Sequence, residues 1–109
     1  MNIEELRDYA LSLPEVTESF PFGEDTLVFK VKNKIFLLMS LSGAILQFNV
    51  KCDPEYAIEL REQYPAVLPG YHMNKKHWNT IIVDGSIGRK QLLDWILDSY
   101  SLVAKIKKP

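Results

Sequence analysis

The sequence predicts an α+β domain, an antiparallel sheet with helices packed on one face. Period-two runs of apolar residues between residues 27 and 50 are typical of half-buried strands, and apolar residues at helical spacing occupy both ends of the chain. Prolines and helix-capping residues separate the two kinds of segment. Consecutive strands flanked by helices are typical of the α+β class. Because 109 residues is near the commonest domain size, we expect a single domain over residues 1–109.

The first expected helix runs from Ile3 to Leu13. Asn2 is a residue type that caps helix N-termini, and Glu5 completes the capping-box pattern three positions later. Apolar residues at helical spacing supply the buried face, and Pro14 ends the helix. These apolar residues are Ile3, Leu6, Ala10 and Leu13.

Three strands are expected next, over residues 27–31, 35–40 and 45–50. In the first and third strands alternate positions are apolar, as a half-buried strand requires, and residues 35–40 form the returning strand between them. Asn33 lies between the first two strands and tolerates the positive φ of a tight turn, and Ser42-Gly43 marks the second turn. The three strands therefore form an antiparallel meander.

A second helix is expected over residues 54–64, a fourth strand over 78–83 and a last helix over 88–103. Asp53-Pro54 combines an N-cap residue with proline at the first helical position, and Pro65 ends that helix. A loop from Ala66 to Lys76 joins it to the fourth strand. The apolar faces of these elements predict a core that contains Phe29, Phe48, Leu60, Ile96 and Tyr100.

Composition excludes several classes of protein. The longest apolar run, Ile35 to Met39, is too short to span a membrane, and the acidic N-terminus is unlike a signal peptide. We therefore expect a soluble cytoplasmic protein. The single cysteine, Cys52, cannot form an internal disulfide and fits a semi-buried apolar position.

The net charge of −1 hides an uneven distribution of charge. Residues 1–25 hold seven acidic residues against Arg7 alone, whereas residues 26–109 hold twelve basic and seven acidic residues. A near-neutral total argues against avid non-specific binding to nucleic acid, which depends on many phosphate contacts. The asymmetry nevertheless leaves room for a local basic patch.

The segment from Pro69 to Thr80 carries the strongest functional signal. It opens with a Pro-Gly turn signal and contains both histidines, two lysines, two aromatic residues and two asparagines. Loops on a rigid scaffold commonly carry binding groups, so this mixture indicates a recognition surface. The alternative is that Tyr71, Met73 and Trp78 cap a small core while the polar residues are solvated.

Nucleic-acid binding is the first functional hypothesis. Lys30 and Lys32 are expected on one sheet face with Lys34 just past the turn, and the later loop could join them by folding against this hairpin. Lysines would contact phosphates, asparagines would contact phosphates or base edges, and Tyr71 or Trp78 would stack on a base. The alternative is a solvated strand face, since edge strands use lysine against aggregation. The candidate site comprises Lys30, Lys32, Lys34, Tyr71, His72, Asn74, Lys75, Lys76, His77, Trp78 and Asn79.

Other functions compete with this hypothesis. Tyr71, Met73 and Trp78 could form an aromatic anchor for a protein partner. His72 and His77 are five residues apart on a loop and match no helical metal-ligand pair, and no catalytic motif is complete. We therefore expect no catalysis and no cofactor, in a monomer or weak dimer that binds DNA or a protein.

Several motifs of unusual composition occur along the chain: Pro21-Phe22-Gly23, Phe29-Lys30-Val31 with Lys34 and Phe36, the run from Pro69 to Lys75, His77-Trp78-Asn79-Thr80 and Ser99-Tyr100-Ser101-Leu102-Val103. Through these motifs the chain resembles the MmcQ/YjbR family of small bacterial proteins. The resemblance covers almost the whole length and implies a fold like that of the bacterial frataxin CyaY, with hairpins as two wings, and a DNA-binding function. The chain departs from the family pattern at Asn33, where glycine is usual, and at Gly88, where proline is frequent.

The likeness to the frataxin fold also implies a further alternative, an acidic surface that binds hard cations weakly through oxygen ligands. The residues concerned are Glu4, Glu5, Asp8, Glu15 and Glu18, whose spacing enforces no closed coordination sphere.

Overall fold

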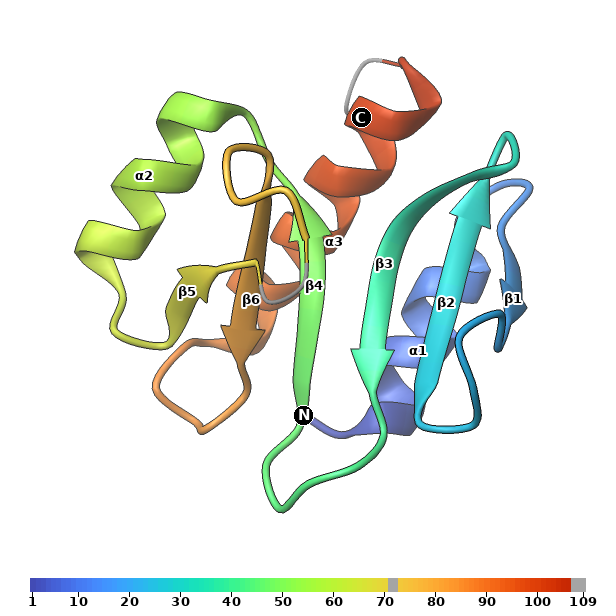
Figure 1. Ribbon diagram of the computed structural model, residues 1–109, viewed down its shortest axis with the longest axis horizontal. Helices are drawn as coiled ribbons and strands as arrows, with labels where there is room; N and C mark the ends of the chain where they lie inside the picture. Colours follow the sequence, from blue (N-terminus) through green and yellow to red (C-terminus); the bar gives the residue numbers. More distant parts are fainter. Residues whose placement is uncertain (71–72, 107–109) are drawn as a thin grey trace.

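The computed structural model describes residues 1–70 and 73–106, which form one six-stranded antiparallel sheet and three helices. The strand order is β1-β2-β3-β4-β6-β5 (Figure 1). The helices are α1 (Ile3–Ser12), α2 (Pro54–Gln63) and α3 (Arg89–Ala104). The strands are β1 (Thr17–Ser19), β2 (Thr26–Val31), β3 (Lys34–Ser40), β4 (Gln47–Lys51), β5 (Val67–Pro69) and β6 (Trp78–Ile82).

Helices α1 and α2 begin directly after the capping residues that predicted their starts. Asn2 Oδ1 accepts a hydrogen bond from Glu5 N at 2.9 Å at the start of α1. Asp53 Oδ1 accepts from Glu55 N at 3.1 Å, and Pro54 occupies the first position of α2. These side chains satisfy amide groups that have no partner inside the helix, which favours each start. None of the helices in the described residues is long and apolar enough to cross a membrane.

The β2–β3 hairpin contains a two-residue turn and a bulge. Lys32 and Asn33 have φ angles of 51° and 66°, and positive φ at both central residues matches the twist of the flanking strands. Phe29 pairs with Leu37 and Lys30 pairs with Ile35, so Phe36 is an extra residue on β3. The bulge lets both Phe36 and Leu37 enter the core, where the Phe36 ring meets the Tyr100 ring edge-on at 5.4 Å.

The core lies between the sheet and the helices. All five side chains predicted to be buried are buried, which confirms the predicted apolar faces of their elements. Tyr100 also donates a hydrogen bond from its hydroxyl to the Pro14 carbonyl at 2.7 Å and so fixes the end of α1 against α3. The α+β class, the three helices and the four predicted strands are confirmed.

Two strands at the sheet edges were not predicted. β1 and β5 have three residues each, too few to show an alternating pattern, and β5 lies in the segment predicted as loop from Ala66 to Lys76. Both strands are recognisable only through their partners, because β1 pairs with β2 and β5 pairs with β6. Edge strands of this length depend on tertiary pairing more than on local propensity.

Ser99 of α3 joins the two halves of the sheet. β3 and β4 pair only from Leu37–Ser40 to Gln47–Val50 and then diverge towards the end nearest α3 (Figure 1). In this region the Ser99 hydroxyl accepts a hydrogen bond from Lys51 N at 2.8 Å and donates one to the Phe36 carbonyl at 2.5 Å. The hydroxyl therefore satisfies a donor on β4 and an acceptor on β3 where the strands no longer pair with each other.

Replacing Ser99 with alanine should lower the free energy of unfolding by about 1–3 kcal/mol, because it leaves one buried amide and one buried carbonyl without partners. Urea denaturation followed by circular dichroism measures this change. Ser101→Ala is the matched control on the same helix, since Ser101 Oγ is buried with no partner among the described residues. An equal loss of stability in both variants would contradict the bridging role of Ser99.

Candidate nucleic-acid interface

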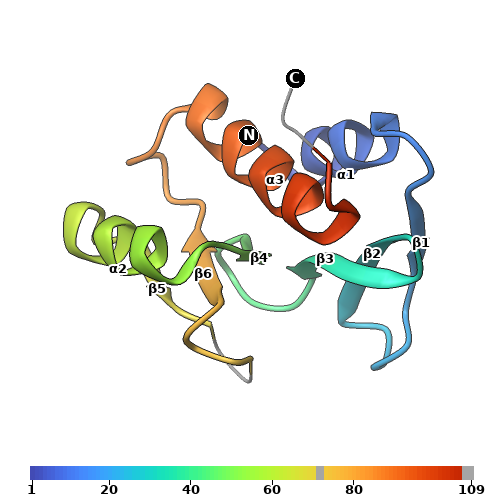
Figure 2. The ribbon, with the colours of Figure 1, turned by 90° about the horizontal axis from the view of Figure 1, so that it is seen from above.

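The face of the sheet opposite α1 and α3 carries the candidate site. Figure 2 shows these helices on one side of the sheet and two loops extending from the other side: the 20–25 loop, and the 70–77 loop, which is described at Gly70 and residues 73–77. We call this second side the open face. Cross-strand pairing places two rows of side chains along it. One row is Val28, Leu38, Asn49, Thr80 and Leu68, and the other is Thr26, Ser40, Gln47 and Ile82.

A groove with a volume of about 560 Å³ occupies the middle of the open face. This volume lies within the range of small-molecule and nucleotide pockets, roughly 300–1,000 Å³. Phe22 in the 20–25 loop and Met73 in the 70–77 loop line it from opposite loops, with strand residues between them. We call it the open-face groove; it is lined by Phe22, Thr26, Leu38, Ser40, Ser42, Gln47, Asn49, Met73 and Thr80.

The floor of the groove combines amide and hydroxyl groups. Thr80 Oγ1 donates a hydrogen bond to Asn49 Oδ1 across β4 and β6, which fixes the orientation of the amide. Within the described residues Asn49 Nδ2 donates no hydrogen bond, and the Gln47 amide lies two residues away on the same strand face. None of the lining residues that the structure describes is charged. The floor therefore suits a neutral group that carries both donors and acceptors.

Three lysines lie on the open face or in the loop beside it. Lys30 follows Val28 by two residues on β2 and Lys51 follows Asn49 by two residues on β4, so both project from the open face. Lys76 is exposed in the 70–77 loop. Within the described residues none of the three ammonium groups makes an ion pair or a hydrogen bond. Lys51 was not among the predicted site residues, although its alternation with Val50 indicates its face.

The three predicted hairpin lysines do not share one surface. Only Lys30 projects from the open face. Lys32 lies in the turn, and its Nζ donates a hydrogen bond to the Ala104 carbonyl at 2.7 Å, at the C-terminal end of α3. A cation at this end of a helix is favourable, so Lys32 has a structural role. Lys34 pairs with Val31 and is exposed at the end of the hairpin. The expectation that Lys30 and Lys32 project from the same face was therefore wrong.

The 70–77 loop is held by hydrogen bonds of its own residues. Asn74 Oδ1 accepts from Lys76 N at 2.9 Å, and the Asn74 carbonyl accepts from Trp78 N at 3.0 Å. Lys75 Nζ donates to the Gly70 carbonyl at 3.1 Å, so this lysine stabilises the loop. His77 is partly buried, and its carbonyl accepts from Cys52 N at 2.7 Å. Tyr71 and His72 lie outside the described residues.

Asn79 was predicted to contact nucleic acid, and the structure corrects this placement. It is 1% exposed and faces the helices. Its Oδ1 accepts from Arg61 Nε at 2.7 Å, and its Nδ2 donates to the Ala57 carbonyl at 3.4 Å. Trp78, the next residue, is partly buried and projects from the opposite side of β6, which is the open face.

Arg61 of α2 connects the helix to the 70–77 loop. Besides Asn79, its guanidinium donates to the Lys75 carbonyl and, at 3.3 Å, to the Trp78 carbonyl. One planar group thus binds both the loop and the first residue of β6, which suits the forked geometry of arginine. Arg61 was not predicted, because its partners are 14 to 18 residues away in the sequence.

Gly70 is required by close packing at the base of the same loop. Its N–H donates to the Trp78 carbonyl at 2.9 Å. A Cβ added at Gly70 would lie 2.8 Å from the Trp78 Cβ and 3.0 Å from the Met73 Cβ. Any larger residue at position 70 would push away the segment that positions Met73 in the wall of the open-face groove.

The catalytic and metal hypotheses gain no support from the described residues. No three of their histidine, cysteine, aspartate and glutamate side chains gather as metal ligands would. In the acidic N-terminal region, Glu5 pairs with Arg89 at 2.7 Å and Glu18 pairs with Arg7 at 2.9 Å. Burial, aided by nearby Asp98 and Asp53, raises the pKa of the Cys52 thiol to about 11, so this cysteine is a poor nucleophile.

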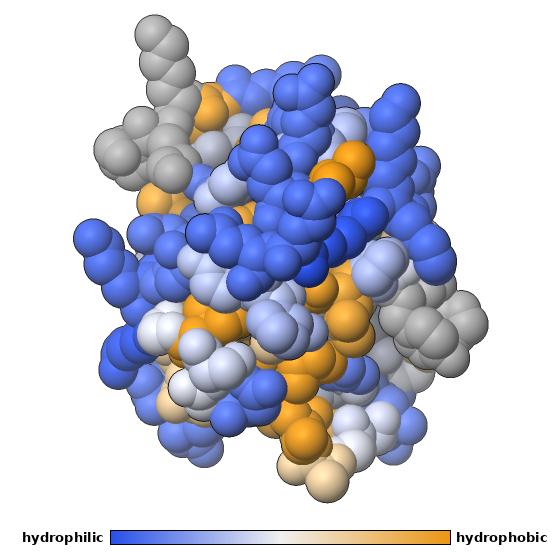
Figure 3. Space-filling view, turned by 90° about the vertical axis from the view of Figure 1, so that its left-hand side faces the viewer, coloured by the Kyte–Doolittle hydropathy of each residue, from blue (hydrophilic) through white to orange (hydrophobic). Residues whose placement is uncertain are grey.

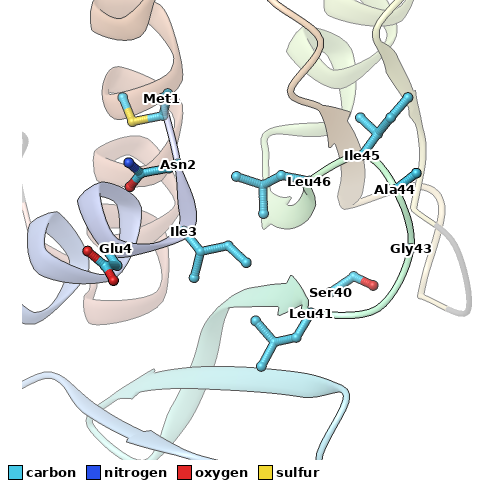
Figure 4. A pocket seen from close by; sticks show the side chains of 10 residues that line it. All are labelled: Met1, Asn2, Ile3, Glu4, Ser40, Leu41, Gly43, Ala44, Ile45 and Leu46. Atoms are coloured by element: carbon cyan, nitrogen blue, oxygen red, sulfur yellow. The ribbon is translucent and has the colours of Figure 1, made fainter.

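Two other surfaces are less suited to a polar ligand. A cavity of about 560 Å³ lies between the N-terminus of α1 and the β3–β4 loop, and Ile3, Leu41 and Leu46 make its lining mainly apolar (Figure 4). The surface at the α2 and β5 edge is hydrophilic above and carries an apolar strip below (Figure 3). Leu68 of β5 is exposed at this edge. Neither surface combines hydrogen-bonding groups with unpaired lysines as the open face does.

The fold and the groove define a class of small α+β domain, with a six-stranded antiparallel sheet covered by helices on one face and open on the other. The sequence model of the YjbR family matches residues 11–102. The chain therefore belongs to the YjbR family, which confirms the resemblance seen in the sequence motifs.

Relatives and solved structures agree with this membership. The chain is 41% identical over 100 residues to the uncharacterised protein YbdF of Escherichia coli O157:H7, covering 92% of this chain and 82% of YbdF. It is 31% identical over 100 residues to YjbR of Escherichia coli strain K12, covering 92% and 85%. The crystal structure of the Deinococcus radiodurans protein DR2400, with domain DUF419, superposes with a TM-score of 0.91 at 39% identity, covering 95% of this chain and 79% of DR2400. The crystal structure of a Pseudomonas syringae protein superposes with a TM-score of 0.82 at 29% identity, covering 94% of this chain and 99% of that protein.

Arg61→Lys should destabilise the 70–77 loop, because a lysine cannot replace the forked contacts to Lys75, Trp78 and Asn79. We expect a loss of about 1–3 kcal/mol in the free energy of unfolding and faster amide hydrogen exchange in residues 73–77. Arg7→Lys is the control, since its pair with Glu18 is exposed and should matter little. Unchanged exchange in residues 73–77 would show that Arg61 does not hold the loop.

Cys52 should react slowly with a thiol reagent in the native protein. With a pKa of about 11, only about one thiol in a thousand is ionised at pH 8, and the thiolate is the reactive form. The reaction with Ellman's reagent at pH 8 should therefore accelerate strongly in urea. Equal rates in the native and unfolded protein would contradict the raised pKa.

Proposed function

We propose that the protein binds DNA through the open face of its sheet, without catalysis. The observation that carries this proposal is that Lys30 and Lys51 project from the same sheet face as a groove with a hydrogen-bonding floor, with Lys76 exposed in the loop that carries Met73. Their ammonium groups would contact phosphates, while the groove would receive the uncharged part of a nucleotide. DNA is the chosen partner because the resemblance to the MmcQ/YjbR family implies it.

The distribution of acidic residues supports this assignment. The three helices carry eight of the fourteen acidic residues, and α1 and α3 lie on the side of the sheet away from the groove. This arrangement keeps the five carboxylates of α1 and α3 away from the lysines of the open face, whereas Glu24 and Asp25 lie in the 20–25 loop next to Phe22. A protein with a net charge near zero can in this way present a local positive field to a polyanion. The helical acidic residues are Glu4, Glu5, Asp8, Glu55, Glu59, Glu62, Asp94 and Asp98.

The proposed site differs from the one predicted from the sequence. It keeps Lys30, Lys76 and Trp78 and adds Lys51 together with the groove. Lys32, Lys75 and Asn79 contribute to it only by stabilising the surrounding structure, because their polar groups bind other parts of the chain.

A protein partner is the competing function, and one observation favours it. Phe20 and Phe22 are 50% and 66% exposed in the 20–25 loop. Exposed aromatic side chains are frequent anchors in protein interfaces. An apolar anchor of this kind would give an affinity that depends little on salt, whereas phosphate contacts weaken steeply with salt.

Combined replacement of Lys30 and Lys51 by alanine should weaken DNA binding at every sequence and flatten the slope of log affinity against log salt. Each phosphate contact contributes about 0.7 to this slope for single strands and about 0.9 for duplexes, so the expected decrease is about 1.4 to 1.8. Fluorescence anisotropy with labelled single-stranded and duplex oligonucleotides, at several salt concentrations, measures this slope.

The control for the lysine variant is Lys90→Glu. It changes the net charge by the same −2 but alters an exposed residue in the first turn of α3, on the helical side. Its salt slope should equal that of the unmodified protein. Equal losses of affinity in both variants would contradict the proposal that DNA binds through the open face. Absence of DNA binding by the unmodified protein at low salt would also contradict it.

A further inference from the structure

We infer that the open-face groove holds one unpaired base of a single-stranded segment, while the flanking phosphates lie against Lys30 and Lys51. This inference rests on the proposed function and adds to it the form of nucleic acid and the part of the nucleotide that enters the groove.

The lining of the groove selects a base over a phosphate. A phosphate would need cationic donors, yet none of the described residues that line the groove is charged. The floor instead offers the Asn49 and Gln47 amides, and side-chain amides pair with the donor and acceptor groups on base edges. The orientation of the Asn49 amide is already fixed by the hydrogen bond from Thr80.

The walls of the groove select an unpaired base. Phe22 on one side and Met73 on the other present apolar groups that can pack against a planar ring. In a duplex the faces of each base are covered by its stacked neighbours, so only an unstacked base offers a face to an aromatic side chain. Phe22 is 66% exposed, and its ring is therefore accessible to such a base.

Charges beside the groove set the direction in which the phosphates run. Lys51 is two residues beyond Asn49 and Lys30 is two residues beyond Val28, and two residues span about 7 Å along a strand. The opposite wall, the 20–25 loop, carries Glu24 and Asp25 next to Phe22. Phosphates are attracted to the lysines and repelled by these carboxylates, so the backbone should pass over the lysine end.

The test compares hexadeoxynucleotides that have equal charge. The probes are dA6, dT6 and a hexamer in which every nucleoside is replaced by an abasic deoxyribose, each measured by anisotropy at low salt. The protein should bind at least one base-containing probe about five-fold or more tightly than the abasic probe, the lower end of what stacking on one aromatic ring contributes. A hairpin of similar charge whose strands are joined by a non-nucleotide linker, so that it has no unpaired base, should bind no better than the abasic probe.

Phe22→Ala should abolish the preference for bases while leaving the affinity for the abasic probe and the salt slope unchanged. Phe20→Ala is the matched control, because Phe20 lies in the same loop, is 50% exposed and does not line the groove. Both residues are exposed, so both variants should fold, and melting temperatures check this. Addition of dA6 to the unmodified protein should shift the NMR cross-peaks of the Asn49 side-chain amide, which would place the base on the groove floor. The same addition to the Phe22→Ala variant should leave these cross-peaks unshifted.

The outcomes separate this inference from the proposed function. Equal binding of abasic and base-containing probes, with the lysine variant still weakening both, would overturn the inference and leave DNA binding by the open face intact. A preference for bases that persists in Phe22→Ala would also overturn it. Absence of binding to every probe at low salt would overturn the proposed function as well.

Discussion

The attachment of α3 to the middle of the sheet is the constraint on which the remaining structure depends. The Ser99 hydroxyl binds Phe36 on β3 and Lys51 on β4 where the two strands have separated, and Tyr100, the next residue, fixes the end of α1. Because these contacts place α1 and α3 on one side, the apolar half of each strand is buried there. The alternate residues lie on the open face, where Val28 and Leu38 are also buried while Gln47 and Asn49 are partly exposed. The groove is therefore a consequence of one-sided packing.

Two loops turn the open face into a groove, and they are held in different ways. The 70–77 loop is tied to α2 by Arg61 and is packed so closely at Gly70 that a Cβ has no room. The 20–25 loop has a local restraint, a hydrogen bond from Gly23 N to the Phe20 carbonyl at 3.4 Å, and Gly23 adopts a φ of 115°. The wall formed by Met73 is thus fixed by tertiary contacts, whereas the wall formed by Phe22 depends on a local turn. A ligand in the groove would gain from the first wall and adjust the second.

The sequence was informative wherever structure depends on neighbouring residues. Caps at Asn2 and Asp53, the turn at Asn33 and the period-two runs specified helices, hairpin and core, because each acts within a few residues. The site was only partly predictable because its determinants are distant. Asn79 looks like a surface residue until Arg61, 18 residues earlier, is seen to bind it. Lys32 alternates correctly with the core, but the positive φ of the turn redirects it to the end of α3. Phe22 gave no signal as a groove residue, because the strands that form the floor lie elsewhere in the sequence.

The separation of charge between the two sides of the sheet reconciles a net charge of −1 with a surface that attracts a polyanion. Glutamates of α1 are partly neutralised by arginines, as in the pair of Glu5 with Arg89, whereas the open-face lysines have no acidic partner among the described residues. With only a few unpaired lysines, electrostatic attraction alone gives weak and salt-sensitive binding. Useful affinity then requires a second contribution that salt does not screen. Stacking and hydrogen bonding within a groove supply that contribution, since they depend on contact between uncharged groups. The few lysines and the uncharged described residues of the groove therefore act together as one recognition surface, the former through salt-sensitive attraction and the latter through contact with uncharged groups.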